Sequence, residues 1–242
     1  MDFRKIKNIS VDIVLFGFDG KDINVLLSKR YLNLYTPHYP IIDDWVLTGN
    51  HIFKSERLDT AAQRVMHDVS GHDAPFMRQF RTFGNPKRVT KSKDLLWSQS
   101  QQIDPRTISV GYYALTHCSD FEIKDSNHQW FPINALPELG FDHQYIIETA
   151  FKYVKEIINV SPIIYHLLPI KFTLNSLLSV YETIFDITID NRNFRKKMIS
   201  KPYIVPLDEK ERQPNSKKPA NLYMFSQDIY RHMITEKPRI II

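Results

Sequence analysis

The chain has 242 residues, of which 43% are hydrophobic and 24% charged, and a formal net charge of +5. This length allows one or two domains with well-buried cores. The single cysteine, Cys118, excludes an internal disulfide framework and fits a reducing compartment. Charged residues interrupt every hydrophobic segment, which excludes a signal peptide and a membrane-spanning run, so we expect a soluble, cytoplasmic protein with no membrane partner.

The excess positive charge lies in the last third of the chain. Residues 1–159 hold 19 Lys and Arg against 19 Asp and Glu, whereas residues 160–242 hold 13 against 8. All 7 glycines, in contrast, lie at or before Gly140. This difference predicts a boundary near 155–162, with domains 1–158 and 159–242, and it indicates that the second domain binds a polyanion.

The first domain begins with the pattern of a β-hairpin. Residues 9–18 (ISVDIVLFGF) are mostly apolar and rich in β-branched side chains. Residues 23–28 repeat this character after the turn-like sequence at 19–22. Lys29 and Arg30 follow directly, where they either face a pocket or end a solvated strand.

A short loop and an amphipathic helix follow a strand at residues 45–49. Apolar residues recur at steps of three and four, which predicts a helix from Ser55, as the N-cap, to a left-handed Gly71. The apolar residues are Leu58, Ala61, Ala62, Val65, Met66 and Val69. The helix therefore packs by one face onto a core.

The loop and helix resemble the Nudix box, the motif that binds metal in Nudix hydrolases. The residues in register with the motif are Glu56, Arg64, Met66, Asp68 and Gly71. Asn50 replaces the first glycine of the motif, and Val65 and Val69 replace two of its metal-binding glutamates.

The two valines determine what this motif can do. Mg²⁺ requires hard oxygen ligands, which valine cannot supply. Glu56 and Asp68 remain, either as ligands or as parts of a solvated surface. We therefore expect a protein that is not an enzyme, with no catalytic residues, no metal site and no cofactor. The alternative is a Nudix hydrolase of nucleoside diphosphate derivatives with an accessory nucleic-acid-binding domain.

The rest of the first domain alternates strands with a helix. A polar stretch over residues 85–106 has no clear periodicity and predicts a mobile loop or an insertion. Strands are predicted at 108–116 and 128–132, and a helix capped by Asp142 at 143–158. Mixed strands with helices packed on them predict an α+β fold, a Nudix-like α/β/α sandwich.

The last third has the layout of a winged helix-turn-helix. Thr173 caps a helix that runs to about Ile184, and a basic helix follows at 190–200. Apolar segments at 203–205 and 222–225 then flank a polar stretch, as strands of a hairpin do. Helix, turn, basic helix and hairpin together predict a DNA-binding module.

Most of the predicted DNA-binding residues have basic or amide side chains. Arg and Asn side chains read guanine and adenine edges, and Lys chiefly contacts phosphate. They are Thr173, Asn191, Arg192, Asn193, Arg195, Lys196 and Lys197 on the helices, and Lys217 and Lys218 in the hairpin loop. The alternatives are a simply solvated basic face, or an interaction protein whose basic tail binds RNA or acidic partners.

These features together resemble the Nudix-related transcriptional regulators, the family that includes the NrtR and AraR regulators. The C-terminal strings are more specific than the altered Nudix box, and the similarity covers nearly the whole chain apart from 85–106 and the tail after about 228. The motifs are VDIVLFGF at 11–18, YYAL at 112–115, LP-any-any-GFDH at 136–143, LLP-any-KFTL at 167–174, YE at 181–182, DNRNFRKK at 190–197 and ANLYMF at 220–225.

The resemblance implies a homodimer whose Nudix-like domains bind an effector and whose winged helices bind a palindromic double-stranded DNA operator. It places the recognition helix on Asn191 to Lys197 and the wing on Asn215 to Ala220, where Asn215 and Pro219 stand in place of the glycines that relatives often have. Effectors of relatives are ADP-ribose and L-arabinose, so a role in sugar metabolism is one expectation.

The effector-binding candidates are chosen by their location in the first domain. They are Asp12, Lys29, Trp45, Glu56, Arg64 and Asp68. For Asp12 and Trp45 the alternative is a paired strand carboxylate and a core aromatic residue. The loss of metal ligands favours a neutral sugar over a diphosphate, since a diphosphate normally brings Mg²⁺ with it.

Overall fold

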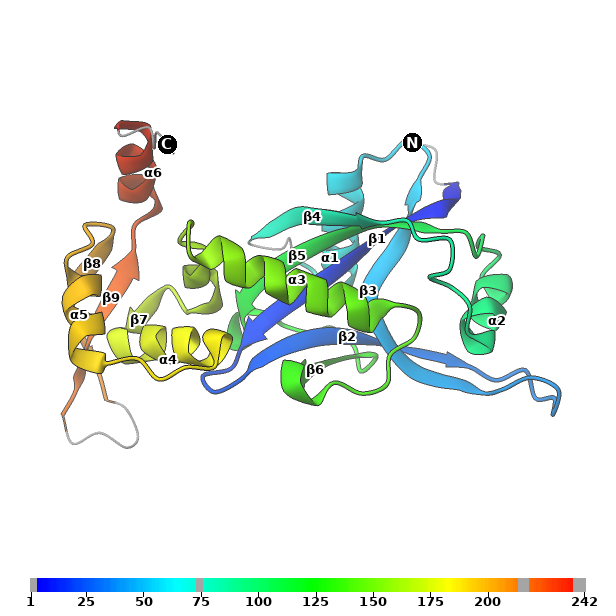
Figure 1. Ribbon diagram of the computed structural model, residues 1–242, viewed down its shortest axis with the longest axis horizontal. Helices are drawn as coiled ribbons and strands as arrows, with labels where there is room; N and C mark the ends of the chain where they lie inside the picture. Colours follow the sequence, from blue (N-terminus) through cyan, green and yellow to red (C-terminus); the bar gives the residue numbers. More distant parts are fainter. Residues whose placement is uncertain (1–3, 73–75, 213–217, 237–242) are drawn as a thin grey trace.

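Two β-sheets organise the protein, which we describe from a computed structural model over residues 4–72, 76–212 and 218–236 (Figure 1). The larger sheet has six strands in the order β4-β5-β1-β3-β2-β6, and the smaller has three in the order β7-β9-β8. The strands of the larger sheet are β1 (Lys5–Phe18), β2 (Ile23–Leu32), β3 (Ile42–Phe53), β4 (Met77–Phe83), β5 (Ile108–His117) and β6 (His128–Pro132).

The central strand β1 is buried on both of its faces from Ser10 to Phe18. It runs parallel to β5 and antiparallel to β2 and β3. Val14 and Phe16 pack into one apolar cluster, while Val11 and Ile13 pack into another. Because neither face meets water, β1 reads as a nearly continuous apolar run rather than an alternating one.

One long helix covers each face of the larger sheet. The apolar face of α1 (Leu58–Ser70) packs into the cluster of Val11 and Ile13, and that of α3 (His143–Ile158) packs into the cluster of Val14. The predicted α/β/α sandwich is therefore confirmed, as is the helix at 143–158. No helix in the described part of the chain combines the length and the apolar character needed to cross a membrane.

The helix α1 begins later than its sequence predicts. Strand β3 continues to Phe53, and the residue at the N-cap position is Arg57, not Ser55, with no side chain capping the helix. The predicted end is confirmed, because Gly71 closes α1 at φ 81°.

The polar segment at 85–106 is an ordered part of the fold rather than an irregular loop. It contains α2 (Ser92–Ser100), in which Asp94, Leu96 and Ser98 are buried. The sequence signal was weak because the helix is short and buries a carboxylate on its inner face instead of an apolar stripe.

The last third has the predicted winged helix arrangement. The hydroxyl of Thr173 accepts a hydrogen bond from the Ser176 amide and caps the first helix, and Asp190 caps the second in the same way. The elements are η3 (Ile163–Leu167), β7 (Lys171–Thr173), α4 (Leu174–Phe185), α5 (Asn191–Ile199), β8 (Ile204–Glu211), β9 (Ala220–Phe225) and α6 (Gln227–Glu236).

A single apolar cluster joins the larger sheet to the winged helix. It contains Phe16 of β1 and Ile147 of α3 together with Leu177 of α4 and Phe194 of α5. At the junction the ring of His166 in η3 stacks on Phe76 at 4.3 Å between centroids. The winged helix is thus packed onto the α3 side of the larger sheet, not joined to it only by a linker (Figure 1).

Candidate effector cavity and nucleic-acid interface

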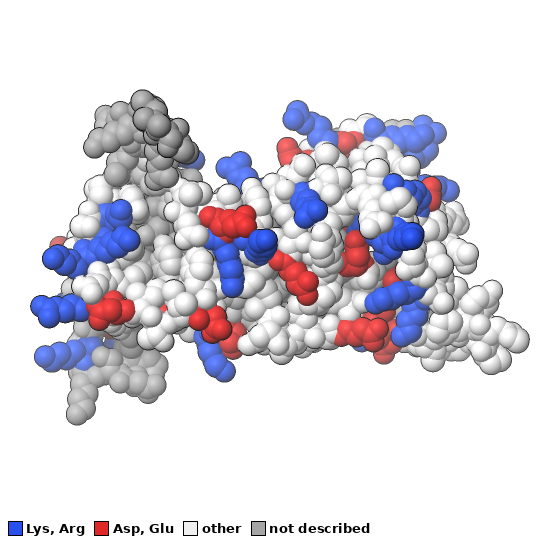
Figure 2. Space-filling view, in the orientation of Figure 1, with Lys and Arg blue, Asp and Glu red and all other residues white. Residues whose placement is uncertain are grey.

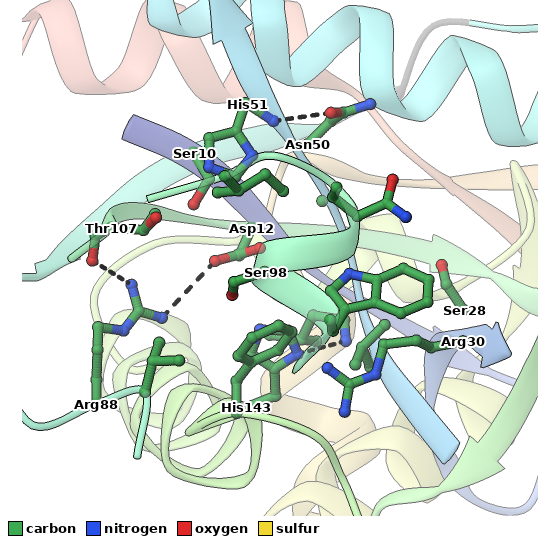
Figure 3. Close-up of a pocket in the computed structure, with 18 of the residues that line it drawn as sticks. Ser10, Asp12, Ser28, Arg30, Asn50, His51, Arg88, Ser98, Thr107 and His143 are labelled. Carbon is green, nitrogen blue, oxygen red and sulfur yellow. Dashed lines mark hydrogen bonds and ion pairs between the residues drawn. The ribbon is translucent and has the colours of Figure 1, made fainter. Parts of the chain in front are cut away.

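A cavity of about 350 Å³ lies on the α3 side of the larger sheet (Figure 3). Its walls come from β1, β2 and β3, from the 85–106 segment, and from the start of α3. The volume falls in the range of small-molecule sites, which is about 300 to 1,000 Å³. The sequence is polar here because Ser10 and Asp12 take positions of β1 that otherwise point apolar side chains at α3.

Arg30 is the most deeply buried charged group of the cavity, with 1% of its side chain exposed. Its Nε donates to Asp44 at 2.7 Å and its Nη2 donates to Asp94 in α2 at 2.8 Å. Phe141 and Trp97 lie against the guanidinium, 4.6 Å and 5.4 Å from their ring centroids. Burial alone would lower the pKa of Arg30, but its hydrogen bonds to the two carboxylates raise it, so the group stays charged.

A second arginine ties the 85–106 segment to both neighbouring elements. Arg88 Nη2 donates to Asp142 at the start of α3 at 2.7 Å and lies 3.9 Å from Asp12 of β1. Asp12 also accepts a hydrogen bond from the Ser109 hydroxyl in β5. Asp142 therefore stands at the predicted N-cap position but binds an arginine instead of capping α3.

Two histidines line the cavity, and burial favours the neutral form of each. Nδ1 of His143 accepts a hydrogen bond from the Leu47 amide at 2.8 Å, and burial lowers the pKa of this ring. Burial also lowers the pKa of His51. His51 Nε2 and Arg30 Nη1 have no hydrogen-bond partner among the residues that the structure describes. The cavity thus offers a ligand two buried polar atoms that the protein leaves unpaired.

Two of the six predicted effector residues line this cavity, namely Asp12 and Lys29. Trp45 instead packs edge-on against Phe131 at 4.8 Å, and Lys29 Nζ lies 5.0 Å from the Trp45 ring centroid. This packing fits the alternative in which Trp45 is a core aromatic residue and not an effector contact.

The Nudix-box residues Glu56, Arg64 and Asp68 lie outside the lining of the cavity. Arg64 donates to both Glu56 oxygens at 2.7 Å and 2.9 Å, and Glu56 also accepts from the Phe53 amide. These bonds join the end of β3 to α1, and they lower the pKa of Glu56. Asp68 is largely exposed and lies 3.9 Å from Arg64. In this structure the pair Glu56 and Arg64 shapes a corner of the fold.

The residues that sequence reasoning missed come from β3, the 85–106 segment and the region around the start of α3. They are His51, Arg88, Asp94, Trp97, Phe141 and His143. Asp94 and Trp97 could have been noticed, because a carboxylate and an aromatic residue three apart share a helix face. Their partner Arg30 lies 64 residues from Asp94, a pairing that no local pattern indicates.

The predicted recognition helix is α5, and most of its polar residues face outward. Phe194 is buried and anchors the helix. The exposed polar residues are Asn191, Arg192, Asn193, Lys196 and Lys197, whereas Arg195 is half-buried. Lys and Arg side chains gather at the end of the molecule where α5 lies, at the left of Figure 2.

The other predicted DNA contacts differ in placement. Thr173 is 2% exposed and its hydroxyl caps α4, so its position suits a structural role rather than a surface contact. Lys218 is exposed in the segment that leads into β9. Lys217 and the wing residue Asn215 lie outside the described residues.

Comparisons with known proteins identify this second region. Residues 164–225 match the sequence model of the NrtR DNA-binding winged helix domain. This stretch of the last third is therefore similar to the winged helix domain of NrtR-type regulators. An ADPR responsive transcriptional repressor from Acinetobacter baylyi is 27% identical over 231 residues, which are 92% of this chain and 83% of that protein. The predicted resemblance to the NrtR-type regulators is therefore confirmed.

Solved structures with the same fold include two proteins of different kinds. Shewanella oneidensis NrtR, crystallised with a 27mer DNA, has a TM-score of 0.70 and 24% identity over 91% of this chain and 94% of that one. A MutT/nudix family protein from Enterococcus faecalis has a TM-score of 0.65 and 20% identity over 93% and 89% of the two chains. These matches confirm a Nudix-like domain followed by a winged helix.

The Nudix-like domain does not fit the metal that Nudix hydrolases bind. Val65 and Val69 are 4% and 3% exposed and belong to the apolar face of α1. Both oxygens of Glu56 are occupied by Arg64. Within the described ranges, no group of three or more His, Cys, Asp or Glu side chains is placed to hold a metal ion.

Proposed function

We propose that the protein is a DNA-binding transcriptional repressor whose Nudix-like domain, residues 1–158, senses a small effector and whose winged helix domain, residues 159–242, binds an operator. The observation that carries this proposal is the helix α5. It is capped by Asp190 and anchored by Phe194, and its exposed side carries basic and amide side chains. Such a helix can enter the major groove and read base edges. The match of this region to an NrtR DNA-binding domain supports the same function.

For the effector we propose ADP-ribose. The described lining of the cavity includes four basic side chains, of Lys5, Lys29, Arg30 and Arg88, and one carboxylate, of Asp12. Each of these four basic side chains already has a partner in the structure. Basic side chains nevertheless outnumber carboxylates in the lining, which suits a ligand with phosphate oxygens better than a neutral sugar. The Acinetobacter relative is named for its response to ADPR. These features outweigh the argument from metal loss that favours L-arabinose, which remains the comparison ligand.

We propose that the protein does not hydrolyse its effector, because α1 carries valines where a metal site needs carboxylates. Robust Mg²⁺-dependent turnover of ADP-ribose that is abolished by Asp68→Ala would overturn this point in favour of the hydrolase alternative.

We further propose a homodimer that binds a palindromic operator, in which the effector changes the spacing of the two recognition helices. The helix α3 provides a path for this change. Its first residue, His143, lines the cavity, and its last residue, Ile158, belongs to the apolar cluster that continues into α4 and α5. The effector must bind the two arrangements with different affinity, since otherwise it shifts nothing.

The proposal is tested with the full chain and a duplex selected from a random pool. We expect ADP-ribose to raise the melting temperature by several degrees and L-arabinose to leave it unchanged. We expect fluorescence anisotropy to show that the selected duplex binds at least 100-fold more tightly than mixed-sequence DNA.

Matched variants test whether α5 carries the binding. Arg192→Ala should weaken binding of the selected duplex by about tenfold or more, whereas Lys152→Ala, which removes one exposed charge from α3, should change it little. The assignment of α5 as the DNA-reading helix would be contradicted if the wild-type chain bound selected and mixed duplexes equally and Arg192→Ala left the affinity for the selected duplex unchanged.

A further inference from the structure

A cleft of about 240 Å³ separates the start of α4 from α5 and the edge of β9. Asn175 of α4, Arg195 of α5, Lys218 and Asn221 contribute to its lining. The described residues that line it include two basic side chains and no carboxylate. The first turn of a helix as long as α4, 12 residues, adds a positive electrostatic potential at one wall. The cleft is therefore built to supply donors and positive charge.

Arg195 is held in the wall of this cleft by two asparagines. Its Nε donates to Asn191 Oδ1 at 2.8 Å, one turn earlier in α5. Its Nη2 donates to Asn175 Oδ1 at 2.9 Å, across the gap to α4. A guanidinium has five N–H donors, so these bonds occupy two and leave three for a ligand. Because both asparagines use their acceptor oxygen, the arrangement fixes the arginine without neutralising its charge.

The position of Arg195 on α5 differs from that of its basic neighbours. Arg192 and Lys196 are exposed on the outer side of the helix, where a groove-reading helix contacts bases. Arg195 is half-buried and turned towards α4, as its bond to Asn175 shows. A fixed arginine set back from the outer face and next to a helix N-terminus suits an oxyanion, whose bidentate binding needs such a fork.

We propose that this cleft binds one phosphate of the DNA backbone. Arg195 contacts the phosphate, and Asn175 and Asn191 position Arg195. This inference rests on the proposed DNA binding and sharpens it, because Arg195 then fixes the register of the protein on the duplex instead of reading a base.

The two roles of an arginine give different signatures in a binding assay. A phosphate contact weakens binding to every sequence alike and lowers the slope of log affinity against log salt by about 1, whereas a base contact relaxes specificity at one position. Arg195→Ala should therefore reduce affinity about tenfold for both the selected duplex and single-base variants of it, with their ranking unchanged. The salt slope should fall by about 1.

Three further variants separate positioning from charge. Arg195→Lys keeps a point charge that can meet phosphate and should keep the wild-type salt slope and base ranking. Asn175→Ala should lower affinity for all duplexes by a smaller factor than Arg195→Ala. In the background of Arg195→Ala, Asn175→Ala should have no further effect, because its role acts through the arginine. Lys152→Ala on α3 serves as the charge control.

The outcomes distinguish this inference from the function on which it rests. Failure of the wild-type chain to bind any duplex would defeat the proposed function itself. Tight wild-type binding combined with a changed base preference in Arg195→Ala or Arg195→Lys, at an unchanged salt slope, would overturn the phosphate contact alone. Additive effects of Asn175→Ala and Arg195→Ala would remove the positioning role.

Discussion

Arg30 shows how single residues join distant parts of this chain. Its guanidinium is enclosed by Asp44, Asp94 and two aromatic rings, so one side chain connects β2, β3 and α2. Gly140 is required beside it, because an added Cβ would lie 2.5 Å from Arg30 Nη2. The sequence indicated a basic residue at a strand end, but its burial depends on Asp94, whose position follows from the tertiary fold.

Asp94→Ala should destabilise the protein by about 3 to 5 kcal/mol, because it removes one partner of a buried charge. The matched control is Glu209→Ala, which breaks a pair with Lys171 of similar length, 2.7 Å against 2.8 Å, but with both side chains about half exposed. The control should cost about 0 to 1 kcal/mol. Urea unfolding of both variants measures the difference, and equal losses would contradict the buried network.

His143 gives a prediction for pH. Burial lowers its folded pKa, whereas the unfolded side chain titrates near its usual value of about 6.5. Below that pH the unfolded chain takes up a proton that the folded chain excludes, so the free energy of unfolding falls as pH drops from 7 to 5. His143→Asn keeps an acceptor for the Leu47 amide and should reduce this loss. An unchanged pH dependence would show that His143 does not contribute.

At the scale of elements, the sequence predicts the absence of metal ligands in α1 and the end of the helix at Gly71. It does not predict where the helix begins. Val65 and Val69 appear in the sequence, and their inability to bind metal needs no structure. The start of α1 depends on Glu56, which bonds to Arg64 and to the Phe53 amide and so fixes the corner before the helix. A local capping rule that starts from Ser55 does not contain this contact.

Restoring the family glutamate at Val69 tests whether α1 is now purely structural. Val69→Glu places a carboxylate on the buried face of α1 and should destabilise the protein by more than about 3 kcal/mol. Asp68→Ala, next to it on the exposed side, should change stability by less than about 0.5 kcal/mol. Thermal and urea unfolding provide the measurement. A stable Val69→Glu protein that hydrolyses ADP-ribose with Mg²⁺ would contradict this account of the helix.

The other helices differ in whether neighbouring residues in the sequence are enough to predict them. The helices α3 and α5 follow from apolar spacing and, for α5, from the Asp190 cap, and both lie within a residue of their predicted ends. The sequence predicts a mobile loop or an insertion where α2 lies, because the inner face of α2 binds Arg30 through Asp94 instead of carrying an apolar stripe. Among the residues that line the cavity, Asp12 and Lys29 are candidates from the sequence, whereas those from α2 are not.

At the scale of the whole molecule, charge and glycine content separate the chain into two regions, yet one apolar cluster runs through both. This cluster extends from Phe16 in the larger sheet through Ile147 of α3 to Leu177 and Phe194 of the winged helix. Composition cannot reveal such packing, because the residues that form it are ordinary core residues in each region. A shared core gives the candidate effector cavity a physical connection to α5.

The most direct test of this account is the coupling between the effector and DNA. We predict that ADP-ribose changes the affinity of the full chain for its selected duplex by about 5- to 150-fold, and that the duplex changes the affinity for ADP-ribose by the same factor, as thermodynamic linkage requires. Calorimetry of ADP-ribose with and without duplex, alongside anisotropy with and without ADP-ribose, gives both numbers. Binding of each ligand with an affinity that is independent of the other would contradict the central claim that the cavity controls the winged helix.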